Sequence, residues 1–95
     1  MKLHNKIAVV TGGAGGIGAA LCRALAAKGA SVVVSDLNLE AAQSVASEID
    51  GLALSCDVSK ESQVQGLISE TESQLGDIDL FVSCLLYTSP SPRDS

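Results

Sequence analysis

A glycine-rich stretch near the start of the 95-residue chain has the composition best suited to chemistry. It reads Thr11-Gly-Gly-Ala-Gly-Gly-Ile-Gly18 and holds five glycines in eight residues. Glycine adopts positive φ and has no Cβ, so a backbone built from it can turn sharply and approach a diphosphate. The N–H groups and the dipole at the start of a helix also favour anions. The stretch therefore predicts a phosphate-binding turn, and the alternative is a tight turn needed only for packing.

The elements that must position this turn follow from hydrophobic periodicity. Short, apolar, β-branched runs predict buried strands at residues 6–11, 31–36, 52–57 and 78–83. Helical patterns lie between them. Because each connection contains a helix, the strands must be parallel and the crossovers right-handed. The fold class is α/β, a Rossmann-type doubly wound parallel sheet truncated after the fourth strand (βαβαβαβ).

Helix ends and inward faces can be read from the same pattern. Asn38 and Ser59 are expected N-caps, and Gly29, Gly51 and Gly76 are expected to stop the helices. Gly66 should weaken the third helix by roughly 1 kcal/mol relative to alanine. The apolar positions expected on the inward faces of the first and third helices are Ile17, Leu21, Leu25, Val64, Leu67, Ile68 and Leu75.

Two glycine registers fit the turn, and the second points to a family. Gly13-x-Gly15-x-x-Gly18 matches the general dinucleotide fingerprint, whereas Thr11-Gly12-x-x-x-Gly16-Ile17-Gly18 has a different spacing. At this second spacing the chain resembles the short-chain dehydrogenase/reductase family from Leu3 to Ser83. The resemblance implies that Gly12, Gly16 and Gly18 form the phosphate turn and that Ile17 offers a backbone amide.

Two acids at strand ends extend the resemblance. Asp36 ends the second strand 18 residues after Gly18, where a carboxylate can bind adenosine ribose hydroxyls and would repel a 2′-phosphate. Residues 13–15 and Leu37 are not basic, so NAD is favoured over NADP. Asp57-Val58 is similar to the family's Asp-Val pair, whose Asp side chain and following amide contact adenine. The alternatives are a solvated acid at Asp36 and a turn residue at Asp57.

Composition bounds the remaining possibilities. Apolar residues are 46% of the chain, aromatic residues 2%, and the net charge is −5. One small domain with a core of small aliphatic side chains is expected. No basic stripe exists, so nucleic acid is not an expected partner. The apolar runs are too short for a membrane span and no signal peptide precedes the first strand, which favours the cytoplasm. The cysteine spacing predicts buried apolar Cys22 and Cys56 and no metal site.

The last twelve residues depart from the family. Cys84-Leu-Leu stands where the family has Asn-Ala-Gly, and no Tyr-x-x-x-Lys can be assembled, because Tyr87 is the only tyrosine and Lys60 the last lysine. Residues 84–94 resemble a translated sequencing adapter, and the alternative is a genuine Pro/Ser tail. The expected organisation is a partial NAD(P)-binding Rossmann domain over residues 1–83 and a non-native or disordered tail over residues 84–95, with no catalytic residue.

The resemblance implies an N-terminal cofactor-binding fragment of an NAD-dependent oxidoreductase that transfers hydride between nicotinamide and an alcohol/carbonyl substrate. The full-length parent is expected to be a homo-oligomeric enzyme with a small-molecule substrate. The fragment itself is expected to be inactive and, with residues 80–82 as an open apolar edge, poorly soluble. The alternatives are a non-catalytic dinucleotide-binding module and an epimerase or dehydratase, whose relatives usually show GxxGxxG and which the TGxxxGIG spacing disfavours.

Overall fold

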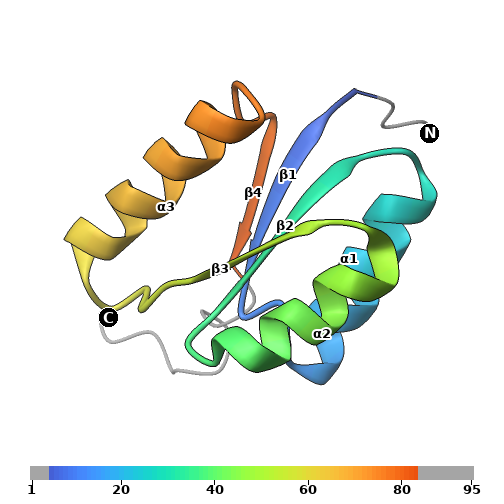
Figure 1. Ribbon diagram of the computed structural model, residues 1–95, viewed down its shortest axis with the longest axis horizontal. Coiled ribbons are helices and arrows are strands. Elements are labelled where there is room, and N and C mark those ends of the chain that lie inside the picture. Colours follow the sequence, from blue (N-terminus) through green and yellow to red (C-terminus); the bar gives the residue numbers. More distant parts are fainter. Residues whose placement is uncertain (1–4, 84–95) are drawn as a thin grey trace, which may run out of the picture.

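The computed structural model describes residues 5–83, in which strands and helices alternate (Figure 1). The elements are β1 (Ile7–Thr11), α1 (Gly16–Ala27), β2 (Ser31–Asp36), α2 (Leu39–Ile49), β3 (Leu52–Ser55), α3 (Glu61–Gln74) and β4 (Leu80–Ser83). This order confirms the predicted βαβαβαβ arrangement. The expectations for the adapter-like segment and the tail concern residues 84–95, which lie outside the described residues, so they stay predictions.

The four strands form one parallel sheet in the order β3-β2-β1-β4. Val9 of β1 lies opposite Val33 of β2 on one side and Phe81 of β4 on the other. The chain thus adds β2 and β3 on one side of β1 and then crosses to the opposite side for β4. The direction of winding reverses between β1 and β4, and in open α/β sheets ligands bind beside the carboxyl ends of strands at such a point.

Helices cover both faces of the sheet, with α1 and α2 on one face and α3 on the other (Figure 1). The strands feed two cores because alternate side chains point to opposite faces. On the α1/α2 face, Val10 and Val34 pack with Cys22 and other small side chains. On the α3 face, Val9 and Val33 pack with Cys56, Leu67 and neighbouring aliphatic groups. Cys22 and Cys56 are therefore buried apolar residues, as predicted.

Several helix ends match the sequence expectations. The Asn38 side chain accepts a hydrogen bond from the N–H of Ala41 at 3.2 Å, so Asn38 is the N-cap of α2. Gly29 and Gly76 follow the C-caps of α1 and α3 with φ of 97° and 117°. Positive φ is a conformation that glycine adopts without steric cost, which is why it ends helices so often.

Other element ends differ from expectation. Lys60, not Ser59, is the N-cap of α3 and it caps without a side-chain bond. Gly51 follows the C-cap of α2 as expected, but the left-handed conformation there belongs to the C-cap Asp50, with φ of 57°. Leu75 was expected to face inward, but it is the C-cap of α3 and 40% exposed. Strand β3 ends two residues before Asp57, and β4 begins two residues after Ile78.

The strand β4 forms one edge of the sheet, and its side chains Leu80 and Phe81 are 41% and 39% exposed.

Among residues 5–83, no helix has both the length and the apolar character to span a membrane. The helices α1 and α2 are joined by a salt bridge of 2.8 Å between Arg23 Nε and Glu48 Oε1. Both side chains are half exposed, so this pair adds little stability.

Candidate functional site

The residues predicted to bind a cofactor meet at the carboxyl edge of the sheet. Parallel strands all end at the same edge. Gly12, Gly16, Ile17 and Gly18 belong to the β1–α1 turn and the first turn of α1, Asp36 ends β2, and Asp57 and Val58 follow β3. Because β3, β2 and β1 are neighbours in that order, the predicted residues lie in a row along this edge.

Three glycines of the turn are required by its backbone conformation or its packing. Gly12 has φ of 70°. A Cβ on Gly18 would lie 2.2 Å from the carbonyl oxygen of Gly12, and a Cβ on Gly13 would lie 2.9 Å from Val34 Cγ1. These glycines let the turn fold on itself and against β2. The packing role of Gly13 was not predicted, although one of the two glycine registers includes it.

Two other glycines of the turn have no such packing role. A Cβ on Gly16 would meet nothing within 4 Å, and one on Gly15 would meet only the carbonyl oxygen of Gly12, at 3.6 Å. Both residues are exposed. The backbone here is open to solvent, so packing alone does not account for the glycine at these positions. Ile17 was expected to face inward with Leu21, but its side chain is 63% exposed. It directly follows the exposed residues Gly15 and Gly16.

The N–H groups of Gly16, Ile17 and Gly18 have no hydrogen-bond acceptor among the described residues, and Gly16 and Ile17 are exposed whereas Gly18 is buried. The first hydrogen bond within α1 runs from the N–H of Ala19 to the carbonyl of Gly15, at 2.7 Å. The three preceding amides therefore have no acceptor one turn earlier in the helix. The helix dipole also places partial positive charge at this end, and such a helix start favours anions.

Asp36 is bound to the glycine turn. Its Oδ2 accepts a hydrogen bond from the N–H of Ala14 at 3.1 Å, and its Oδ1 accepts one from the N–H of Asn38 at 3.2 Å. The side chain is half-buried. Within residues 5–83 the one ion pair is that between Arg23 and Glu48, so no described cation neutralises Asp36. The carboxylate lies beside the turn, where it was expected to bind the ribose hydroxyls.

Asp57 has a local structural role at the end of β3. Its Oδ1 accepts hydrogen bonds from the hydroxyl and the N–H of Ser59, at 2.6 and 3.0 Å. These bonds lower the pKa of the Asp57 carboxyl. The N–H of Asp57 donates to Gln63 Oε1 at 2.8 Å, and Val58 packs against the core on the α3 face. The turn interpretation of Asp57 thus holds, and the adenine contacts of Asp57 and Val58 stay predictions.

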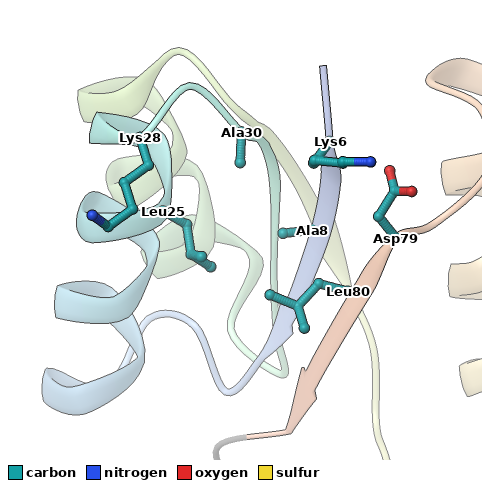
Figure 2. Close-up of a pocket in the computed structure, with 7 residues that line it drawn as sticks. All are labelled: Lys6, Ala8, Leu25, Lys28, Ala30, Asp79 and Leu80. Atoms are coloured by element: carbon teal, nitrogen blue, oxygen red, sulfur yellow. The ribbon is translucent and has the colours of Figure 1, made fainter. Parts of the chain in front are cut away.

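A cavity of about 480 Å³ lies at the opposite edge of the sheet, beside the amino ends of β1 and β4. Its lining consists of Lys6, Ala8, Leu25, Lys28, Ala30, Asp79 and Leu80. Figure 2 shows the apolar side chains of α1 and the two strands facing one another across it. The Oδ2 of Asp79, the residue before β4, accepts a hydrogen bond from the N–H of Ile7 at 2.9 Å and so joins β1 to the start of β4. This cavity is separate from the candidate site.

Comparison with known proteins agrees with the fold described above. Residues 6–86 match the short chain dehydrogenase family. An uncharacterized oxidoreductase of Bacillus subtilis (strain 168), YuxG, is 43% identical over 100 residues, which cover 98% of this chain and 14% of that protein. The crystal structure of a hydroxysteroid dehydrogenase from Escherichia coli superposes with a TM-score of 0.79 at 38% identity, covering 86% of this chain and 37% of that one.

A structure titled ribose-5-phosphate isomerase, from Brucella melitensis 16M, superposes with a TM-score of 0.84 at 37% identity, covering 87% of this chain and 32% of that one. The chain therefore spans less than two fifths of the length of each of these three proteins. The match to the family extends over most of the chain, and it includes both the glycine turn and the strand ends that surround it. The chain belongs to the short chain dehydrogenase family.

Proposed function

We propose that this chain holds the adenosine diphosphate part of NAD in an oxidoreductase of the short chain dehydrogenase family. The amides of Gly16, Ile17 and Gly18 bind the diphosphate, while Gly12 shapes the turn. Asp36 accepts hydrogen bonds from the adenosine ribose, and Asp57 and the amide of Val58 contact adenine. The observation that carries the proposal is the open backbone at Gly16, where a Cβ would meet nothing within 4 Å, beside a helix start with three available amides.

The preference for NAD over NADP rests on charge. A phosphate on the ribose 2′ oxygen would lie beside the Asp36 carboxylate, which no described cation neutralises. Two unit charges 4 Å apart near a protein surface repel by about 4 kcal/mol. Salt screening lowers this figure, but a remaining penalty of about 1.4 kcal/mol is already a tenfold loss of affinity.

The bound cofactor would supply or accept a hydride. In the whole protein the substrate would be a small molecule with an alcohol or carbonyl group, as the family resemblance implies. Two of the relatives carry oxidoreductase names, the Bacillus subtilis protein and the Escherichia coli hydroxysteroid dehydrogenase. This chain contributes the binding and orientation of the cofactor's adenosine end.

Equilibrium titration of the 95-residue chain with ADP and with 2′-phosphorylated ADP tests the proposal. ADP should bind, and the 2′-phosphorylated ligand should bind at least about tenfold more weakly. Asp36→Ala should narrow that difference. Asp50→Asn also removes one negative charge, at the far end of α2, and should leave the difference in affinity between the two ligands unchanged. Equal or tighter binding of the 2′-phosphorylated ligand would overturn the NAD preference, and failure to bind either ligand would overturn the proposed site.

Turnover by the whole protein distinguishes an enzyme from a non-catalytic dinucleotide-binding module. A protein that carries these residues and continues to the length of the relatives should oxidise NADH in the presence of a carbonyl substrate, followed by absorbance. Binding of NADH without turnover across a panel of ketones and aldehydes would favour a binding module.

A further inference from the structure

The Asp36 carboxylate bridges two backbone segments that are not adjacent in the chain. Ala14, whose N–H donates to Oδ2, lies 22 residues before Asp36 in the middle of the glycine turn. Asn38, whose N–H donates to Oδ1, begins α2. A second bond joins the same segments, from the N–H of Gly13 to the carbonyl of Ser35 at 2.9 Å. The glycine turn is therefore fastened to the end of β2 by one backbone bond and one carboxylate bond.

We propose that Asp36 is a positioning residue for the diphosphate as well as a ligand of the ribose. This inference rests on the proposed function of the site. By holding Ala14, the carboxylate fixes the part of the turn that leads directly into the open residues Gly15 and Gly16. A glycine-rich turn has more backbone freedom than other sequences, so an external anchor reduces the ordering that the diphosphate would otherwise have to impose.

The two roles of Asp36 are compatible. A carboxylate has roughly four lone-pair directions on its two oxygens, and the amides of Ala14 and Asn38 use one on each oxygen. Ribose hydroxyls can donate to the remaining directions without displacing the turn. The same two amides also fix the orientation of the carboxylate. Ribose binding and diphosphate binding should therefore support each other through this one side chain.

The positioning role of Asp36 can be tested, because the negative charge of this side chain weakens the binding of an anion whereas its hold on the turn strengthens that binding. A carboxylate near the turn repels a diphosphate, so its neutralisation should tighten binding if charge alone matters. Asparagine at position 36 has nearly the same shape but only one acceptor oxygen, so it can keep only one of the two amide bonds. If positioning dominates, Asp36→Asn should weaken the binding of a diphosphate even when the ligand has no ribose hydroxyls to contribute.

The experiment titrates the 95-residue chain, Asp36→Asn and the control Asp50→Asn with ADP and with 2′,3′-dideoxy-ADP. The control also removes one carboxylate, and its left-handed φ of 57° suits asparagine. We expect Asp36→Asn to weaken the binding of both ligands by about tenfold, as the loss of a charge-assisted hydrogen bond predicts. The control should change neither affinity. Hydrogen exchange at the Ala14 amide should be faster in Asp36→Ala, which can keep neither amide bond, while exchange in the middle of β1 and β2 stays unchanged.

Each result has one interpretation. Weaker ADP binding with unchanged or tighter dideoxy-ADP binding would show that Asp36 acts only on the ribose, and would overturn the positioning role while leaving the proposed function intact. Unchanged exchange at Ala14 in Asp36→Ala would overturn it as well. If the unsubstituted chain binds neither ligand while its β1 and β2 amides are protected, the proposed function itself fails and the inference falls with it.

Discussion

The glycine turn offers a direct test of which residues serve packing and which serve a ligand. A Cβ on Gly18 would lie 2.2 Å from the carbonyl oxygen of Gly12, so that oxygen would have to move by about 0.8 Å to reach a 3.0 Å contact. The atoms in the way belong to the backbone, including Gly13 Cα at 2.9 Å, and a backbone cannot yield by a rotamer change. A Cβ on Gly16 would meet nothing within 4 Å.

The magnitude of the Gly18→Ala effect follows from two opposing contributions. Overpacking of a well-packed site costs about 1–3 kcal/mol, and contact with backbone places this substitution near the upper end. Alanine in a helix is about 1 kcal/mol better than glycine, and position 18 is the third residue of α1. The net loss in the free energy of unfolding should be about 2 kcal/mol, which lowers the melting temperature of a domain of this size by roughly 8–16 °C.

Gly16→Ala should behave in the opposite way. The melting temperature should stay the same or rise slightly, because helix propensity improves and no contact is violated. ADP affinity should fall by about tenfold, since the added methyl occupies space that a phosphate oxygen needs beside the amide of residue 16. The assays are thermal unfolding followed by circular dichroism and ADP titration of the two variants and the unsubstituted chain.

This pair of variants separates the two interpretations of the turn. A Gly16→Ala chain that binds ADP normally would mean that the open backbone does not contact the diphosphate. A Gly18→Ala chain with an unchanged melting temperature would refute the packing argument, because the turn would then tolerate a Cβ that the geometry excludes.

Three further predictions concern local structure. Asn38→Ala should lower stability by about 1 kcal/mol through loss of the α2 cap, and Asn38→Gly by a few tenths, as measured by urea unfolding. The Ser59 bonds hold the pKa of Asp57 below its ordinary value of 3.8. They therefore stabilise the fold fully above that pH and lose their effect as pH falls through the folded-state pKa. Thermal melts of Ser59→Ala should show a deficit at pH 7 that shrinks as the pH falls below 3.8. Cys22 and Cys56 are buried and burial raises the pKa of the Cys56 thiol, so both should resist maleimide in the folded chain and react in urea, as read by peptide mass.

The sheet and its connections could be predicted from the sequence because each strand is apolar on both faces. Val32, Val33 and Val34 are all buried, with alternate side chains in different cores, and such continuous runs distinguish parallel strands between helices from amphipathic ones. Asp36 and the glycine turn could be placed at one edge for the same reason, since parallel strands end together.

Helix caps and exposed faces could not be predicted as well, because they depend on competition between neighbours. Ser59 is a good N-cap by type, but the Asp57 carboxylate accepts its hydroxyl at 2.6 Å, and the helix begins later, at Glu61. Ile17 fits the inward spacing of α1, yet the first turn of the helix lies at the edge of the sheet and leaves it 63% exposed. Periodicity describes a helix as if it were uniform along its length.

The bond between Ala14 and Asp36 was also beyond sequence analysis, and it changes how the strand-end acid is understood. The spacing from Gly18 predicts that Asp36 faces the ribose, but spacing contains no information on which backbone amide the carboxylate binds. In the structure Oδ2 lies 3.1 Å from the N–H of Ala14. Asp36 was predicted only to lie near the glycine turn, but its carboxylate is bonded to the backbone of that turn.

The two edges of the sheet differ in a way that suits a ligand site. At the amino edge, Ile7 is bonded to Asp79 through both its N–H and its carbonyl, and the N–H of Ser31 donates to the carbonyl of Lys6 at 2.8 Å. At the carboxyl edge, the amides of residues 16–18 remain available beside a turn that is itself anchored. A backbone held in place before binding loses little conformational freedom when a ligand arrives. Affinity should therefore depend on the contacts that keep this turn in position as much as on the amides that face the diphosphate.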